Sequence, residues 1–164
     1  MPLTISAEKL LDWNDNTTQR WRSFILANPI ILTLPCDIRN GKTIADTLQH
    51  IVAVELRYAQ RLSSLPESPY EEVVKDSIDS IVAAHELAIS LVRNLLADPD
   101  YDWSVELTFD TISLGRLRAS RETVLVHLTL HSIRHYAQLA TLVRQNGFRP
   151  TWPMDYLFSA AQRA

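Results

Sequence analysis

The sequence predicts an all-α fold, a four-helix bundle with a long connection before the last helix that has room for a short hairpin. Three observations lead to this prediction. Four long segments place apolar residues at steps of three and four, which is the helical period. The 164 residues include only three glycines, and none of the eight prolines interrupts a periodic segment. The length fits a single domain over residues 1–164.

Most of the predicted helices begin at a recognisable capping signal. Ser6 can cap the first helix, and Thr43 with Asp46 forms a capping pair for the second. Ser68 followed by Pro69 is typical of a helix start, so the third helix is predicted to begin there. The predicted helices cover residues 6–27, 43–64, 68–97 and 120–146, and the long connection covers residues 99–119.

Apolar stripes predict which side chains form the core. The stripe of the first helix consists of Leu10, Trp13, Thr17, Trp21 and Phe24. We expect its three aromatic rings to pack inside the bundle. The stripe of the third helix includes Val74, Ile81, His85, Ala88 and Val92. The C-terminal tail, which we expect to cover the bundle, carries Trp152, Tyr156 and Phe158.

The composition excludes several kinds of site. Cys36 is the only cysteine, which excludes an intrachain disulfide, a paired-cysteine zinc site and an iron–sulfur cluster held by this chain alone. The glycines lie far apart, so glycine-rich phosphate-binding loops are absent. One of them, Gly147, is placed to end the last helix. The net charge of −3 gives no general attraction to nucleic acid or to anionic membranes.

A basic cluster before the last helix is the one hint of nucleic-acid binding. It consists of Arg116, Arg118 and Arg121. A solvated loop explains it better, because 19 acidic residues outnumber 16 basic ones. We find no targeting segment and no run of about 20 apolar residues. We therefore expect a cytoplasmic protein that binds neither membrane nor nucleic acid.

Five histidines are the main functional clue, and three of them lie in the last predicted helix. His131 and His135 occupy the middle of its apolar stripe, whereas His127 lies at the edge. Two histidines spaced i, i+4 present both rings from one side of a helix, which is how one helix gives a metal ion two ligands. The alternative is a pair of core histidines, each satisfied by hydrogen bonds.

A third ligand has to come from another helix, and periodicity favours His85, which lies within the stripe of the third helix. His50 lies well off the stripe of the second helix. Glu55 lies on that stripe, where it is either a buried carboxylate that partners a histidine or an edge residue paired with an arginine. No glutamate stands three residues before any histidine, which argues against a ferritin-like di-iron site.

Two segments resemble a known family. Residues 127–138, HLTLHSIRHYAQ, and the helix that continues to residue 147 resemble the last-helix signature of the DinB/YfiT-like superfamily. Residues 50–62 resemble that family's second helix, and residues 155–157 are similar to its tail. The resemblance covers nearly the whole chain in length and order. One departure is Tyr136 and Ala137, which stand where many members have arginine and glycine.

The resemblance implies a four-helix bundle in which three histidines hold a divalent metal ion, Zn²⁺, Ni²⁺ or similar. Carried over residue by residue, the ligands are His50, His131 and His135, and this set replaces the periodicity-based choice of His85. His127 matches a position that is usually not a ligand. The candidates for supporting roles around the metal are Glu55, Tyr58, His85 and Gln138.

The resemblance also implies a function, because characterised relatives include enzymes that use a low-molecular-weight thiol. The first hypothesis is a metal-dependent hydrolase or thiol-dependent transferase or isomerase that acts on a small molecule. The alternative is a non-catalytic, stress-linked metal-binding or structural dimeric protein. A homodimer is expected in either case. The sequence adds one reason for it, since the second helix has apolar residues on more than one side, including Ile51, Val54 and Leu56.

Overall fold

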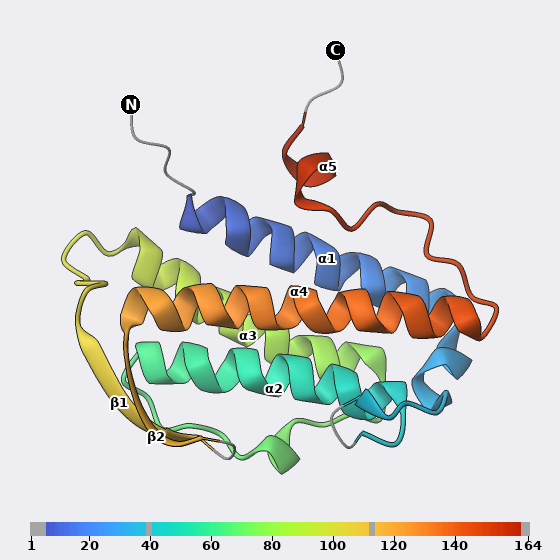
Figure 1. Cartoon of the computed structure of the whole chain (residues 1–164), viewed down its shortest axis with the longest axis horizontal. Helices are drawn as coiled ribbons and strands as arrows, with labels where there is room; N and C mark the ends of the chain where they lie inside the picture. The colour runs from blue at the N-terminus through green and yellow to red at the C-terminus, as the bar shows by residue number, and fades with distance from the viewer. Residues whose placement is uncertain (1–5, 39–40, 112–113, 162–164) are drawn as a thin grey trace.

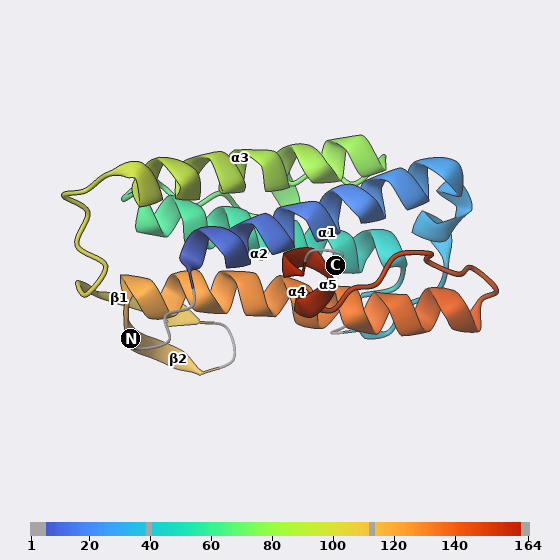
Figure 2. The same cartoon turned by 90° about the horizontal axis from the view of Figure 1, so that it is seen from above.

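Four long helices make up most of the computed structural model, which describes residues 6–38, 41–111 and 114–161. They lie side by side in both views (Figures 1 and 2). Their bounds are Ala7–Ala27 for α1, Ile44–Leu62 for α2, Ile78–Ala97 for α3 and Arg121–Gln145 for α4. Helix α1 packs against α3 and α4, and so does α2. The apolar faces of all four helices therefore meet in the interior. The structure is thus mainly helical, as predicted, with one small two-stranded sheet.

The ends of α1, α2 and α4 follow local capping chemistry. The Ser6 hydroxyl accepts the Lys9 backbone N–H, and Ser120 accepts that of Thr123. At the start of α2, Thr43 forms the predicted reciprocal capping box with Asp46. These three predicted starts are confirmed. Gly147 follows α4 with φ of +87°, a left-handed conformation that favours glycine, so its predicted role is also confirmed.

The third helix begins later than predicted. Pro69 precedes only a short 3₁₀ turn, η3 (Tyr70–Glu72). The helix α3 begins at Ile78, where Ser77 accepts the Ser80 backbone N–H in its own capping box. Val74 therefore lies outside the helix and is exposed, so its predicted place in the core stripe is wrong.

Contacts with α2 explain this shift, because they hold the segment 63–77 across that helix. Glu67 forms an ion pair with Arg61 at 2.6 Å. Gln60 bonds both the backbone N–H and the hydroxyl of Ser68, each at 2.8 Å. Ser68 is thereby engaged by α2 and is not available to cap a helix. Tertiary contacts have overridden a local start signal.

A hairpin occupies part of the long connection, as predicted. Strands β1 (Glu106–Thr111) and β2 (Gly115–Ser120) pair antiparallel beside the end of α2 (Figure 1). The ring of Phe109 lies under the Arg61 guanidinium at 4.1 Å and edge-on to the ring of Tyr58. These contacts hold the hairpin beside the residues of the functional site described below.

The buried face of α1 is rotated by about one residue from the predicted stripe. It consists of Leu11, Asn14, Thr17, Thr18, Trp21 and Ile25. Trp21 is fully buried, as predicted, whereas Trp13 and Phe24 are half-buried beneath the C-terminal tail. Trp152 of the tail contacts both Trp21 and Phe24 at ring distances of 5.5 Å, and Tyr156 packs edge-on against Trp13 at 5.4 Å. The prediction that the tail covers the helices is confirmed for Trp152 and Tyr156, whereas Phe158 is exposed. Tyr156 begins the short helix α5 (Tyr156–Ala160).

We predict that Trp21→Ala lowers the free energy of unfolding by about 3–5 kcal/mol, because it leaves a large cavity among fully buried side chains. Urea denaturation of the purified variant measures the loss. Leu26→Ala is the matched control, since Leu26 lies on the same helix and is half exposed; its effect should stay within about 0.5 kcal/mol. Equal stability of the two variants would contradict the assignment of Trp21 to the core.

The apolar residues of α2 that suggested a dimer surface are buried within the chain. Ile51, Val54 and Leu56 expose 6 % or less of their surface. Ile51 and Leu56 belong to the core between the helices, and α2 packs against both α3 and α4. The apolar residues of α2 are therefore no evidence for a partner interface, that reason for a dimer is wrong, and the dimer depends on the resemblance alone.

One described helix, α3, has the length and composition needed to cross a membrane, with 20 residues and a mean hydropathy of 1.3. A core helix of a soluble protein passes the same test. The side chains of Ile81, Ala88 and Val92 on α3 are buried against the other helices. Of its most apolar 18-residue window, 33 % is buried, so core packing accounts for part of the apolar character of α3.

Candidate metal centre

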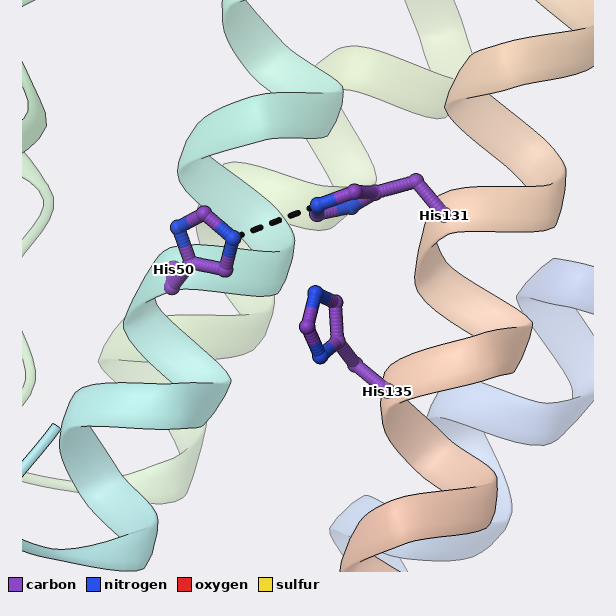
Figure 3. A group of neighbouring side chains, drawn as sticks. All are labelled: His50, His131 and His135. Carbon is purple, nitrogen blue, oxygen red and sulfur yellow. Dashed lines mark hydrogen bonds between the residues drawn. The ribbon is translucent and has the colours of Figure 1, made fainter. Parts of the chain in front are cut away.

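Three histidine rings meet between α2 and α4. His50 comes from α2, and His131 and His135 come from successive turns of α4, with all three rings pointing toward one another (Figure 3). Their candidate ligand nitrogens all lie within 4.8 Å of one another. The Nε2 atoms of His50 and His131 are 3.2 Å apart. The structure thus brings together the three histidines that the resemblance selected.

Helix geometry explains this convergence. The i, i+4 spacing places His131 and His135 on one face of α4, where both side chains are nearly fully buried. His50 is half-buried and lies off the centre of the α2 stripe. Because α2 packs against α3 on one side and α4 on the other, a residue away from the stripe centre can face α4. The apolar periodicity of a helix predicts which residues are buried, but it does not predict which neighbouring helix each of them faces.

The donor set fits a divalent metal ion. Burial, together with the neighbouring His135 and His50, lowers the pKa of His131 to about 2, so its ring stays neutral, as a ligand must be. The Nδ1 atom of His131 is buried without a hydrogen-bond partner among the described residues. Two imidazole nitrogens that share one Zn²⁺ ion at about 2.0–2.1 Å in tetrahedral geometry lie about 3.3 Å apart, close to the spacing of His50 and His131.

Gln138, one of the candidates for a supporting role, contacts His135. Its side-chain oxygen lies 2.7 Å from Nδ1 of His135 and can accept the proton of that nitrogen. This bond orients the ring and keeps the lone pair on Nε2, the tautomer that a metal ligand of this kind needs. Gln138 stands one turn after His135, so the contact is a local consequence of helix spacing.

A pocket of about 300 Å³ opens beside the histidines. Its walls come from α2, α4, the η3 turn and the hairpin, and its lining includes His50, His131, Tyr58, Tyr70, His127 and Leu117. Tyr70 stacks on His50 with the two rings nearly parallel, at 6.1 Å. Tyr58 packs edge-on against His127 at 5.3 Å. Tyr58 and His127 are thus wall residues, and His127 lies outside the three-histidine group, as expected.

A second polar cluster lies in the core and joins all four helices. The Glu55 carboxylate of α2 accepts hydrogen bonds from Asn14 of α1 at 2.7 Å and Ser132 of α4 at 2.6 Å. Its other oxygen lies 2.7 Å from Nδ1 of His85 on α3. Glu55 and His85 are both fully buried. The interpretation of Glu55 as a buried carboxylate that partners a histidine is confirmed, and the arginine alternative is wrong.

His85 therefore serves this cluster and lies outside the three-histidine group. Burial alone would lower its pKa, but the carboxylates of Glu55 and Asp15 on either side of the ring raise it to about 9. A ring held protonated between two carboxylates has no lone pair for a metal. Periodicity correctly placed His85 in the core, and the carboxylates around it give it a different role.

Sequence reasoning missed several polar residues of these sites. Asn14 and Ser132 stand on the buried faces of α1 and α4, where a polar side chain needs a buried partner. That conflict between residue type and position was the available signal. Tyr70 was missed because it was assigned to a helix, whereas the η3 turn places it beside His50.

We predict that the raised pKa of His85 makes stability depend on pH. The folded chain binds this proton more tightly than the unfolded chain, whose histidine pKa is about 6.5. The contribution is therefore complete below about pH 6.5 and is lost as the pH rises through about 9. The free energy of unfolding should fall by roughly 3 kcal/mol between about pH 6 and pH 10.

Urea denaturation across this pH range measures the effect. His85→Gln is the control, since its amide keeps polar contacts but does not titrate. The difference in stability between wild type and His85→Gln should shrink with rising pH. A difference that stays constant from pH 6 to pH 10 would contradict the raised pKa.

Comparison with known proteins adds a family match. The sequence model of the DinB family matches residues 5–163, nearly the whole chain. No curated protein matches the chain.

Proposed function

The chain belongs to the DinB family, and from this premise we propose that it is a metal-dependent enzyme whose four helices form the bundle of that family. His50, His131 and His135 hold a divalent ion, Zn²⁺, Ni²⁺ or similar. The observation that carries this proposal is the meeting of three imidazoles, two of them nearly fully buried, beside an open pocket. Imidazole ligands do not select sharply among these metals.

A divalent ion held by three neutral imidazoles keeps at least one open position and acts as a Lewis acid toward a bound water, thiol or carbonyl group. The chain's own residues prepare the site for this chemistry. Gln138 fixes the orientation of His135 through its 2.7 Å contact. Tyr70 packs against His50 and limits its movement. The buried positions of His131 and His135 keep bulk water away from two of the three ligands.

The size of the pocket supports the proposal of a small substrate. Its volume of about 300 Å³ lies at the lower end of the range of about 300–1,000 Å³ for small-molecule sites. Its walls combine aromatic rings, aliphatic side chains and arginines. We propose a hydrolase, or a transferase or isomerase that uses a low-molecular-weight thiol.

Metal analysis followed by activity measurement tests this function. Protein purified without an affinity tag is analysed for metal, loaded with Zn²⁺ or Ni²⁺, and assayed with ester substrates and with electrophiles in the presence of cysteine or glutathione. Activity that needs the metal and disappears in His131→Ala supports the proposal. A loaded protein that turns over none of these substrates favours the alternative, a non-catalytic metal-binding protein. A chain that takes up no metal contradicts both.

We also propose a homodimer, on the strength of the family resemblance. Sedimentation velocity at tens of micromolar protein should give a species of twice the chain mass. A single monomeric species at this concentration would contradict the proposal.

A further inference from the structure

The pocket contains three arginines, and only one of them is left without a carboxylate. Arg57 and Arg61 both form ion pairs with Glu67, at 2.8 and 2.6 Å. Arg134 stands on α4 directly before His135 and lines the same pocket. Among residues 6–38, 41–111 and 114–161, no carboxylate lies within 4.0 Å of its guanidinium.

Arg134 lies beside the three-histidine group. Its Nη2 atom is 3.5 Å from Nε2 of His135. Although Arg134 is exposed to solvent, a cation this close to the histidines opposes the binding of a divalent ion, because like charges repel. A negatively charged ligand between the guanidinium and the metal ion offsets this repulsion. The position of Arg134 therefore suits an anionic ligand in the pocket.

The surroundings indicate how much negative charge the ligand carries. Glu67 cancels only one of the two positive charges of Arg57 and Arg61. With Arg134 and Asp110, the three guanidiniums and two carboxylates leave a net charge of +1 for the ligand. Asp110 of the hairpin also lines the pocket and disfavours a second negative charge. A planar guanidinium matches a carboxylate with two parallel hydrogen bonds. A single carboxylate fits this environment better than a phosphate ester with two negative charges.

We propose that Arg134 binds the carboxylate of a small monoanionic substrate in this pocket. The inference rests on the proposed function, since it places the substrate beside the metal centre. The side chains of Tyr58 and Leu117 supply the apolar wall for the rest of the molecule. Arg134 is thus the residue that selects a carboxylate-bearing substrate over a neutral one.

Two matched probes test this subsite. Zinc-loaded protein is titrated by isothermal calorimetry with 3-mercaptopropionate and, separately, with its methyl ester, which keeps the thiol and removes the charge. The wild type should bind the acid on the order of tenfold more tightly than the ester. Arg134→Gln should remove this preference, while Arg144→Gln, which changes an exposed arginine of the same helix outside the pocket, should keep it.

Metal content distinguishes a structural effect from loss of the subsite. Arg134→Gln should hold at least as much zinc as the wild type, because a repelling cation has been removed. Equal binding of acid and ester by the zinc-loaded wild type, or equal loss of both probes in Arg134→Gln, would overturn the proposal.

Titration of the metal-free protein separates this inference from the proposed function. A preference for the acid that depends on Arg134 supports the subsite even if the chain holds no zinc. If neither the metal-free nor the zinc-loaded wild type binds the acid more tightly than the ester, the proposed subsite is wrong, whatever the metal content of the protein.

Discussion

Replacing His131 with alanine is expected to empty the metal centre. The change leaves two of three imidazoles, so metal affinity should fall far more than the roughly 10–100-fold expected for losing a residue that only supports a ligand. His50→Ala and His135→Ala should have the same effect, because the three candidate nitrogens lie together. The untagged wild type and variants are incubated with the same concentration of Zn²⁺ and dialysed side by side. Elemental analysis then gives the metal content per chain.

His85→Ala and His127→Ala are the matched controls. His85 is held between Glu55 and Asp15 in the core, and His127 lies in the pocket wall, so both variants should retain the metal. The metal content of Gln138→Ala should lie between those of the two groups, because Gln138 contacts His135 but does not itself bind the metal. A full site in His50→Ala together with an empty site in His85→Ala or His127→Ala would show that the ligand assignment is wrong.

Glu55→Ala is expected to destabilise the fold by about 3–5 kcal/mol. The change removes the carboxylate that the buried His85 faces, and it also removes the acceptor for Asn14 and Ser132. Removing one partner of a buried pair leaves the other without compensation in a medium that solvates charge poorly. Urea denaturation at pH 7 measures the loss.

Two comparisons isolate the cause of this loss. Glu86→Ala removes an exposed carboxylate from α3 and should change stability by less than about 0.5 kcal/mol. The double variant Glu55→Leu/His85→Leu should be more stable than Glu55→Ala, because neither partner remains buried alone. If Glu55→Ala unfolds at the same urea concentration as the wild type, the buried cluster contributes nothing to stability.

Local signals in the sequence were sufficient for much of the fold. The starts of α1, α2 and α4 follow from side chains that bond the backbone three residues later, and the end of α4 follows from a glycine in a left-handed conformation. The pairing of His131 with His135 on one face also follows from helix spacing alone. Such contacts span four residues or fewer, so sequence patterns describe them well.

Two features required contacts between distant segments. The start of α3 was wrong because Glu67 and Ser68 are held by side chains of α2, which compete with the local capping signal. The predicted face of α1 was displaced because Asn14 is buried, and its side chain finds a hydrogen-bond acceptor there in Glu55. In both cases a polar side chain obtained its partner from another helix.

The sequence by itself determined four helices, a hairpin and two histidines that share one face of α4. Only the tertiary structure decided which third histidine lies beside this pair. Apolar periodicity predicts burial, and both His50 and His85 lie near the interior, so periodicity could not distinguish them. His85 faces two carboxylates and is protonated there, whereas His50 faces the neutral ring of His131 on α4. The physical difference lies in the charges that the neighbouring helices present, and these are fixed only when the helices pack.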